Sequence, residues 1–131
     1  MVHALEEARR ILAEHGALVD ARPDSRLAAR VRAAAPRGPV IGTIGTQRET
    51  KRDDQVSDRA VREVLRRRLF LSRRRGRFWH AMPFETVAEL QTYLADHLRF
   101  SRRISWRVPR ARRDGLVYVE RPIRFEVLLR T

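Results

Sequence analysis

Histidine is the side chain best suited to acid–base chemistry and metal binding near neutral pH, and the sequence contains four. They are His3, His15, His80 and His97. No two of them have the i, i+4 spacing of a helical zinc site, and the chain has no cysteine to complete one. We therefore expect structural or surface roles for all four.

Nucleophilic and phosphate-binding motifs are also missing. None of the serines lies in a G-x-S-x-G elbow, and no glycine-rich loop of the P-loop kind is present. Gly42 and Gly45 lie in an otherwise β-branched run, which is more typical of a strand with close backbone packing. The sequence therefore predicts a domain without a self-sufficient active site.

Arginine accounts for 28 of the 29 basic residues, and the formal net charge is +13. The excess lies in the second half, where residues 66–77 and 99–113 each hold seven arginines and no acid. If both clusters share one face, they could bind a nucleic-acid backbone. The alternative is a solvated arginine-rich surface that reflects coding bias. The candidate nucleic-acid contacts are Arg73, Arg74, Arg75, Arg102 and Arg103.

The elements that must position these residues follow from hydrophobic periodicity and stop signals. We expect helices over 5–12, 57–68 and 87–98, the second capped by Ser57 and the third opened by a Thr86–Glu89 capping box. Residues 25–35 could form a helical turn or two, and 47–55 read as a polar loop. Strands are expected over 17–21, 39–46, 78–82, 104–108, 116–119 and 123–129.

These elements predict one α+β domain over residues 1–131. About three helices pack on a small mixed or antiparallel sheet of four or five strands. No apolar run approaches the roughly 20 residues that span a bilayer, and acids replace the basic start of a signal peptide. We therefore expect a cytoplasmic protein with no membrane partner.

The segment from Ala4 to Pro23, ALEEARRILAEHGALVDARP, resembles a stretch of class I S-adenosylmethionine-dependent methyltransferases. In that family the stretch is the helix after the fourth sheet strand followed by the fifth strand. Glu14-His15-Gly16 occupies the position of the family's usual Pro-Gly-Gly turn, so only one of the two glycines is present. Residues 1–23 thus resemble the methyltransferase core, and 24–131 its C-terminal region, ending in a closing strand at 125–130.

The resemblance implies a region without the family's cofactor half, because no glycine-rich loop or ribose-binding acid can be matched here. Such a region would be a fragment, a split partner or a remnant of a methyltransferase and is not expected to be catalytic alone. The chain alone is expected to bind no cofactor, and S-adenosylmethionine would need a completing N-terminal half. Arg48, Glu49, Trp79 and His80 are candidates for a substrate wall. A fifth strand without its fourth leaves an open edge at 17–21, which predicts self-association or a partner protein there.

Overall fold

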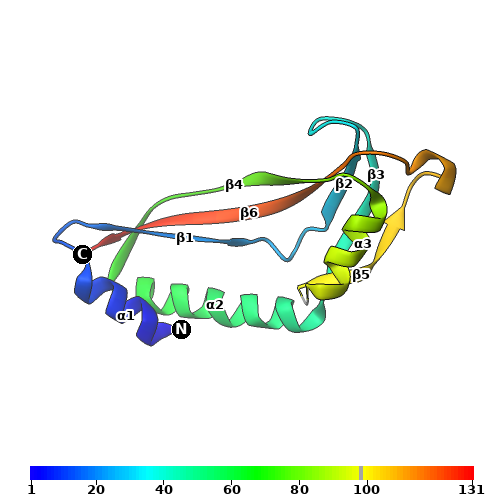
Figure 1. Cartoon of the computed structure of the whole chain (residues 1–131). Coiled ribbons are helices and arrows are strands. Elements are labelled where there is room, and N and C mark those ends of the chain that lie inside the picture. Colours follow the sequence, from blue (N-terminus) through cyan, green and yellow to red (C-terminus); the bar gives the residue numbers. More distant parts are fainter. Residues whose placement is uncertain (98) are drawn as a thin grey trace. The chain divides into compact units, whose positions relative to one another are not determined.

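The computed structural model describes residues 1–97 and 99–131 and has an α+β fold, in which helices accompany a six-stranded, mostly antiparallel sheet (Figure 1). Leu98, the last position of the predicted third helix, lies outside the described residues. The helices of the described chain are α1 (Val2–Ile11), α2 (Arg48–Arg66), α3 (Val87–Asp96) and the short 3-10 helix η1 (Arg110–Arg112). The strands are β1 (Ala17–Pro23), β2 (Ala29–Ala33), β3 (Val40–Thr46), β4 (Phe70–Phe84), β5 (Phe100–Trp106) and β6 (Val117–Arg130).

The long strand β6 organises the sheet. The order is β1-β6-β2-β3-β5, and β4 also pairs with β6. The second half of β6 pairs antiparallel with β1, from Ala17 opposite Leu129 to Pro23 opposite Ile123. Its first half pairs antiparallel with β2. The chain forms two compact units, and both β4 and β6 contribute to each of them.

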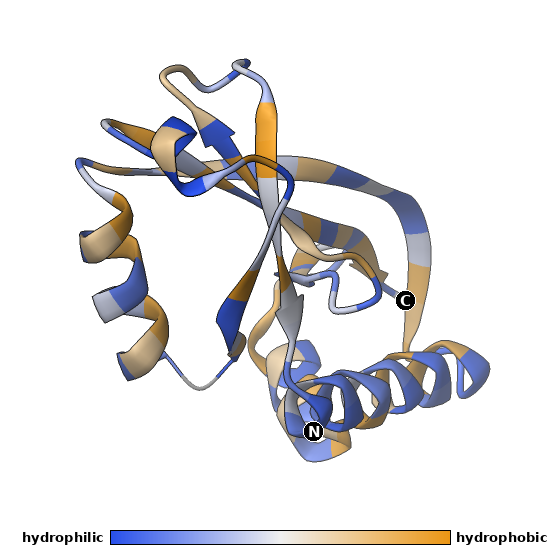
Figure 2. Cartoon of the chain, turned by 90° about the vertical axis from the view of Figure 1, so that its right-hand side faces the viewer, coloured by the Kyte–Doolittle hydropathy of each residue, from blue (hydrophilic) through white to orange (hydrophobic). Residues whose placement is uncertain are grey.

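Unit 1 comprises residues 1–23, 52–77 and 123–131. Its core joins one side of the sheet to α1 and α2, with Leu128 fully buried among Leu5, Val61 and Val64. Most residues of α2 are hydrophilic (Figure 2). Its apolar residues Ala60, Val61, Val64 and Leu65 meet this core, whereas Val56 is exposed.

Unit 2 comprises residues 24–51 and 78–122. Leu90 and Leu94 of α3 are buried in a core with residues of β2, β3, β5 and β6. The predicted capping box opens α3, because the Thr86 hydroxyl accepts a hydrogen bond from the Glu89 amide at 3.1 Å. The carboxylate of Glu89 accepts one from the Glu85 amide at 2.8 Å.

Two local predictions were wrong. Residues 29–33, expected to be helical, form β2, because Ala29 and Val31 alternate with arginines and enter the unit 2 core. All of the expected 47–55 loop except Gln47 lies inside α2, as does the expected cap at Ser57. Arg, Glu, Lys and Gln are good helix formers even without an apolar stripe.

The sheet has six strands rather than the expected four or five, because β2 was not predicted as a strand. Two boundaries also differed. The strands predicted at 116–119 and 123–129 form one strand, β6, which begins at Val117 and continues through Arg121 and Pro122. The strand predicted at 78–82 extends back to Phe70 as the 15-residue β4. Among the described residues, no helix is both long and apolar enough to cross a membrane.

Candidate functional site

One edge of β1 is unpaired in the described part of the chain, because β1 is the terminal strand of the sheet. The Arg130 amide donates to the Gly16 carbonyl at 2.9 Å, and the Asp24 amide donates to the Pro122 carbonyl at 2.8 Å. In an antiparallel ladder such hydrogen-bonded pairs alternate with non-bonded ones. The even-numbered residues of β1 therefore direct their backbone groups to β6. Ala17, Val19 and Ala21 direct theirs to the free edge.

The side chains of these three residues lie on an apolar face of the unit 1 sheet. The register places Ala17, Val19 and Ala21 opposite Leu129, Val127 and Phe125. The α1 and α2 helices of this unit lie on the other side, over Leu18 and Leu128 (Figure 1). None of the six residues belongs to either core cluster, and Val19 is 59% exposed. The free edge of β1 therefore borders an apolar sheet face that neither α1 nor α2, the helices of unit 1, covers.

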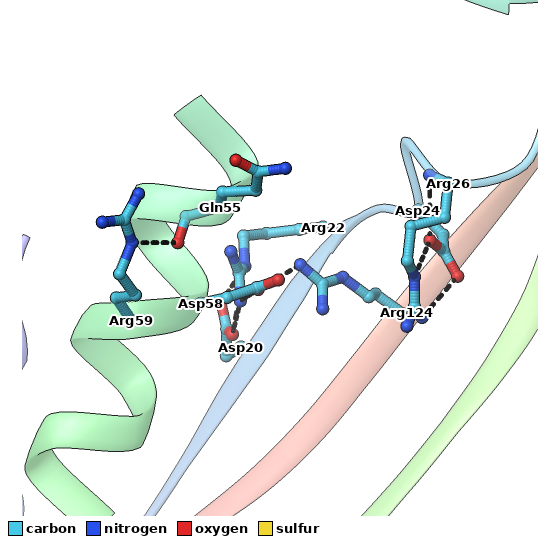
Figure 3. Close-up of polar contacts among 8 residues, drawn as sticks. All are labelled: Asp20, Arg22, Asp24, Arg26, Gln55, Asp58, Arg59 and Arg124. Atoms are coloured by element: carbon cyan, nitrogen blue, oxygen red, sulfur yellow. Dashed lines mark hydrogen bonds and ion pairs between the residues drawn. The ribbon is translucent and has the colours of Figure 1, made fainter. Parts of the chain in front are cut away.

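A charge cluster holds α2 to this sheet. Figure 3 shows Asp58 of α2 between Arg22 of β1 and Arg124 of β6. Arg22 is 3.0 Å from Asp58 and 2.8 Å from Asp20, and Arg124 donates to Asp58. All four side chains are at most 26% exposed. The cluster is therefore a partly buried network that joins three elements.

Electrostatics keep the network ionised. Burial opposes ionisation of Asp58, but the hydrogen bonds and charges of Arg124 and Arg22 outweigh it and lower the pKa of Asp58 below 3.8. Burial also opposes the charge on Arg22, and Asp20 and Asp58 outweigh it and raise its pKa. With every member paired, the network fits a structural role better than acid–base chemistry.

The predicted substrate-wall residues lie in unit 2, at the first residues of α2 and on β4. Arg48 and Glu49 form the exposed start of α2. Trp79 and His80 are neighbours on β4, where Trp79 is half-buried and His80 exposed. The guanidinium of Arg30 lies 3.9 Å from the centre of the Trp79 ring. Within the described chain, no hydrogen bond or ion pair links Arg48 or Glu49 to the β4 pair, so a substrate wall stays a prediction.

The candidate nucleic-acid contacts of the first predicted arginine cluster lie on β4 in unit 1. Arg73, Arg74 and Arg75 are exposed on the strand. Arg75 is 3.6 Å from Glu126, a weak and largely solvated ion pair. Glu126 is also the acceptor for the Ser72 hydroxyl. This cluster therefore has an acid beside it on the same sheet.

The second cluster lies on the edge strand β5 and the turn that follows it, in unit 2. Arg102 and Arg103 occupy the stretch where the β3–β5 register shifts. This irregularity explains why two consecutive side chains are both exposed. We define the β5 arginine cluster as the exposed arginines on β5 and the turn after it: Arg102, Arg103, Arg107, Arg110 and Arg112. Arg99, which is also exposed, precedes the strand and is not included.

No residue of the β5 arginine cluster forms a side-chain ion pair within the described chain. Arginines elsewhere in the same unit do, such as Arg32 with Glu120 at 2.7 Å and Arg26 with Asp24 at 2.8 Å. Residues 99–113 contain no acid. The cluster is therefore a concentration of uncompensated positive charge.

Arg113 fixes the turn that carries the last two members. Its guanidinium donates to the Val108 carbonyl at 3.1 and 3.2 Å and lies 4.4 Å from the centre of the Trp106 ring. A side chain at Gly42 would come within 3.1 Å of Trp106, so the indole rests against β3. The turn is thus anchored to the sheet.

Sequence reasoning found both arginine clusters but missed two features. The Asp58 network joins residues far apart in the chain, and no local pattern marks it. The register of the free edge follows only from the pairing of β1 with β6. No group of three His, Cys, Asp or Glu residues that could hold a metal occurs in residues 1–97 and 99–131. Comparisons with known protein families, with curated proteins and with solved structures find no match to this chain.

Proposed function

We propose that this chain is a methyltransferase-like region that is inactive alone and joins a polypeptide carrying an S-adenosylmethionine site. The observation that carries the proposal is the free edge of β1, which lies beside an apolar sheet face that α1 and α2 do not cover. A strand edge of this kind is a template for pairing with another strand. The proposed function is sheet completion.

The local structure of residues 4–23 supports the methyltransferase resemblance. The segment forms a helix and then a strand, α1 and β1, which is the order of the family's fourth helix and fifth strand. The predicted closing strand, 125–130, is part of β6 and pairs antiparallel with β1. In the family the fourth strand lies beside the fifth, and the free edge of β1 is the position that such a strand would take.

The chemistry of the edge fits a strand as its occupant. Ala17, Val19 and Ala21 offer amides and carbonyls, and their side chains are too small to block an approaching backbone. Asp20 and Arg22 pair with each other, so neither leaves an unpaired charge at the edge. Pro23 has no amide hydrogen and therefore limits the available ladder.

In the absence of a cofactor-bearing polypeptide, the same edge would pair with a second copy. An antiparallel pairing centred on Val19 brings Val19 opposite its counterpart and Ala17 opposite Ala21. All three residues would then exchange hydrogen bonds with the other copy. Self-association of the purified chain is therefore the measurable signature of the edge.

The cofactor part of the proposal is tested by calorimetric titration of the purified chain with S-adenosylmethionine. We expect no binding, because no glycine-rich loop or ribose-binding acid matches the family's cofactor site. Saturable binding with micromolar affinity would overturn the proposal. Thermal denaturation in the same buffer, with a cooperative transition, ensures that an absence of binding comes from folded protein.

A further inference from the structure

The β5 arginine cluster has features that the proposed assembly does not use. Its five arginines lie within eleven residues, on an edge strand and an anchored turn, and all are exposed. The cluster belongs to unit 2, whereas the free edge of β1 belongs to unit 1. It therefore needs an explanation of its own.

The density of the cluster distinguishes it from the other exposed arginines, because its five members lie within eleven residues and residues 99–113 contain no acid. Arg22, Arg32 and Arg124, by contrast, are paired with carboxylates. Five like charges close together repel one another, and an anionic ligand would relieve that repulsion.

The sheet face beside the cluster is polar and carries hydroxyl groups. Cross-strand pairing places Arg30, Thr43 and Ser105 in one row across β2, β3 and β5. On the side away from β5 the row ends at Glu120 of β6, whose carboxylate is paired with Arg32. The opposite face holds Val31, Val119 and the α3 core. Hydroxyl and guanidinium groups are the side chains that proteins use to contact phosphate oxygens. A row of them continuous with the arginine edge suits an extended polyanion.

We propose that the β5 arginine cluster binds the phosphate backbone of single-stranded nucleic acid. An edge strand with an anchored turn presents its guanidinium groups along a line, which matches the repeated phosphates of one strand. The Trp79 ring, with Arg30 over it, lies on the same unit and offers a surface for a base. A lipid surface is the competing anionic partner, and apolar side chains to insert into it are missing from the cluster.

The test measures binding of the full chain to a fluorescein-labelled 20-nucleotide single-stranded DNA by anisotropy. If five phosphates are contacted, the slope of log K against log salt is about −3.5, so affinity falls about 100-fold between 50 and 200 mM salt. A nanomolar to low micromolar chain concentration keeps self-association through β1 out of the measurement. Nucleic-acid binding by the β5 arginine cluster and strand pairing at β1 are therefore tested separately, and either one can be refuted without refuting the other.

Two matched variants locate the site. Changing all five cluster arginines to Gln should weaken binding at 100 mM salt by at least tenfold and bring the slope close to zero. The control changes five exposed arginines outside the cluster to Gln, namely Arg37, Arg48, Arg52, Arg62 and Arg68. Both variants lower the formal net charge by five, from +13 to +8. Changing the cluster to Lys, which keeps the charge, should retain most of the salt dependence.

Three results would overturn the inference. The first is wild-type binding that does not depend on salt, and the second is an equal loss in the cluster and control variants, which would assign binding to overall charge. The third is tighter binding to vesicles containing 30% phosphatidylserine than to the oligonucleotide. Circular dichroism of each variant shows that lost binding does not come from unfolding.

Discussion

Asp58 is the position where a single substitution should most clearly reveal how unit 1 is held together. Its carboxylate accepts from Arg22 and Arg124 and connects α2 to β1 and β6. Asp58→Asn keeps the shape of the side chain and removes its charge. We expect the substitution to lower the free energy of unfolding.

The magnitude follows from the two contacts. A hydrogen bond to a charged group contributes about 1.5–3 kcal/mol, so two give about 3–6 kcal/mol at most. Asp58 is 26% exposed, Arg22 keeps Asp20 as a partner, and Asn can still accept a hydrogen bond. These considerations reduce the expected loss to about 2–3 kcal/mol.

Urea denaturation followed by circular dichroism at 222 nm measures the effect, because α2 supplies much of the helical signal. Asp53→Asn is the matched control, since Asp53 lies on the same helix, is exposed and has no ion pair in the described chain. The control should change stability by less than about 0.5 kcal/mol. Equal effects of the two substitutions would refute the role of the network.

The pH dependence provides a second test of the same network. The pKa of Asp58 is lowered in the folded chain, so its contribution is fully present above the ordinary value of 3.8. It is lost as the pH falls through the lowered, folded-state pKa. The difference in stability between the wild type and Asp58→Asn should be the same at pH 7 and pH 5 and should shrink below 3.8. If the stability difference disappeared between pH 7 and pH 5, a titrating group other than Asp58 would be responsible for it.

Three further substitutions test the packing. In Gly76→Ala the new methyl group would lie 2.9 Å from the Phe125 ring, so urea denaturation should show a loss of about 1–3 kcal/mol, and no loss would mean that the ring moves freely. Thr86→Ala removes the hydroxyl that caps α3 and should cost about 1 kcal/mol, measured by tryptophan fluorescence, whereas an unchanged midpoint would deny the cap a role. Leu128→Ala leaves a cavity in the unit 1 core and should cost about 2–5 kcal/mol by circular dichroism; less than 1 kcal/mol would contradict its full burial.

Local patterns predicted much of the secondary structure. The Thr86–Glu89 capping box, the strand at 39–46 and the helix and strand of residues 4–23 each have a signal within a few residues. The β2 strand also has one, since Ala29, Val31 and Ala33 alternate with arginines. The high helix propensity of Ala and Arg obscured that alternation.

Long-range features were not predictable in the same way. The start of α2 has no apolar stripe, so its helical state could be read only from residue propensity. The pairing of Asp58 with Arg124 spans 66 residues. The exposure of both Arg102 and Arg103 depends on a register shift between β3 and β5, which a single strand's sequence does not specify.

The free edge of β1 is tested most directly by sedimentation velocity of the purified, nucleic-acid-free chain from 5 to 300 μM. About 0.3 M salt screens the repulsion between strongly basic copies. Val19→Lys places a charge at the centre of the edge. Val56→Lys is the matched control, because Val56 of α2 is 54% exposed and Val19 59%. We expect the wild type and Val56→Lys to form dimers as concentration rises, and Val19→Lys to stay monomeric. A wild-type chain that is monomeric throughout, or a Val19→Lys variant that dimerises like the wild type, would contradict docking at β1.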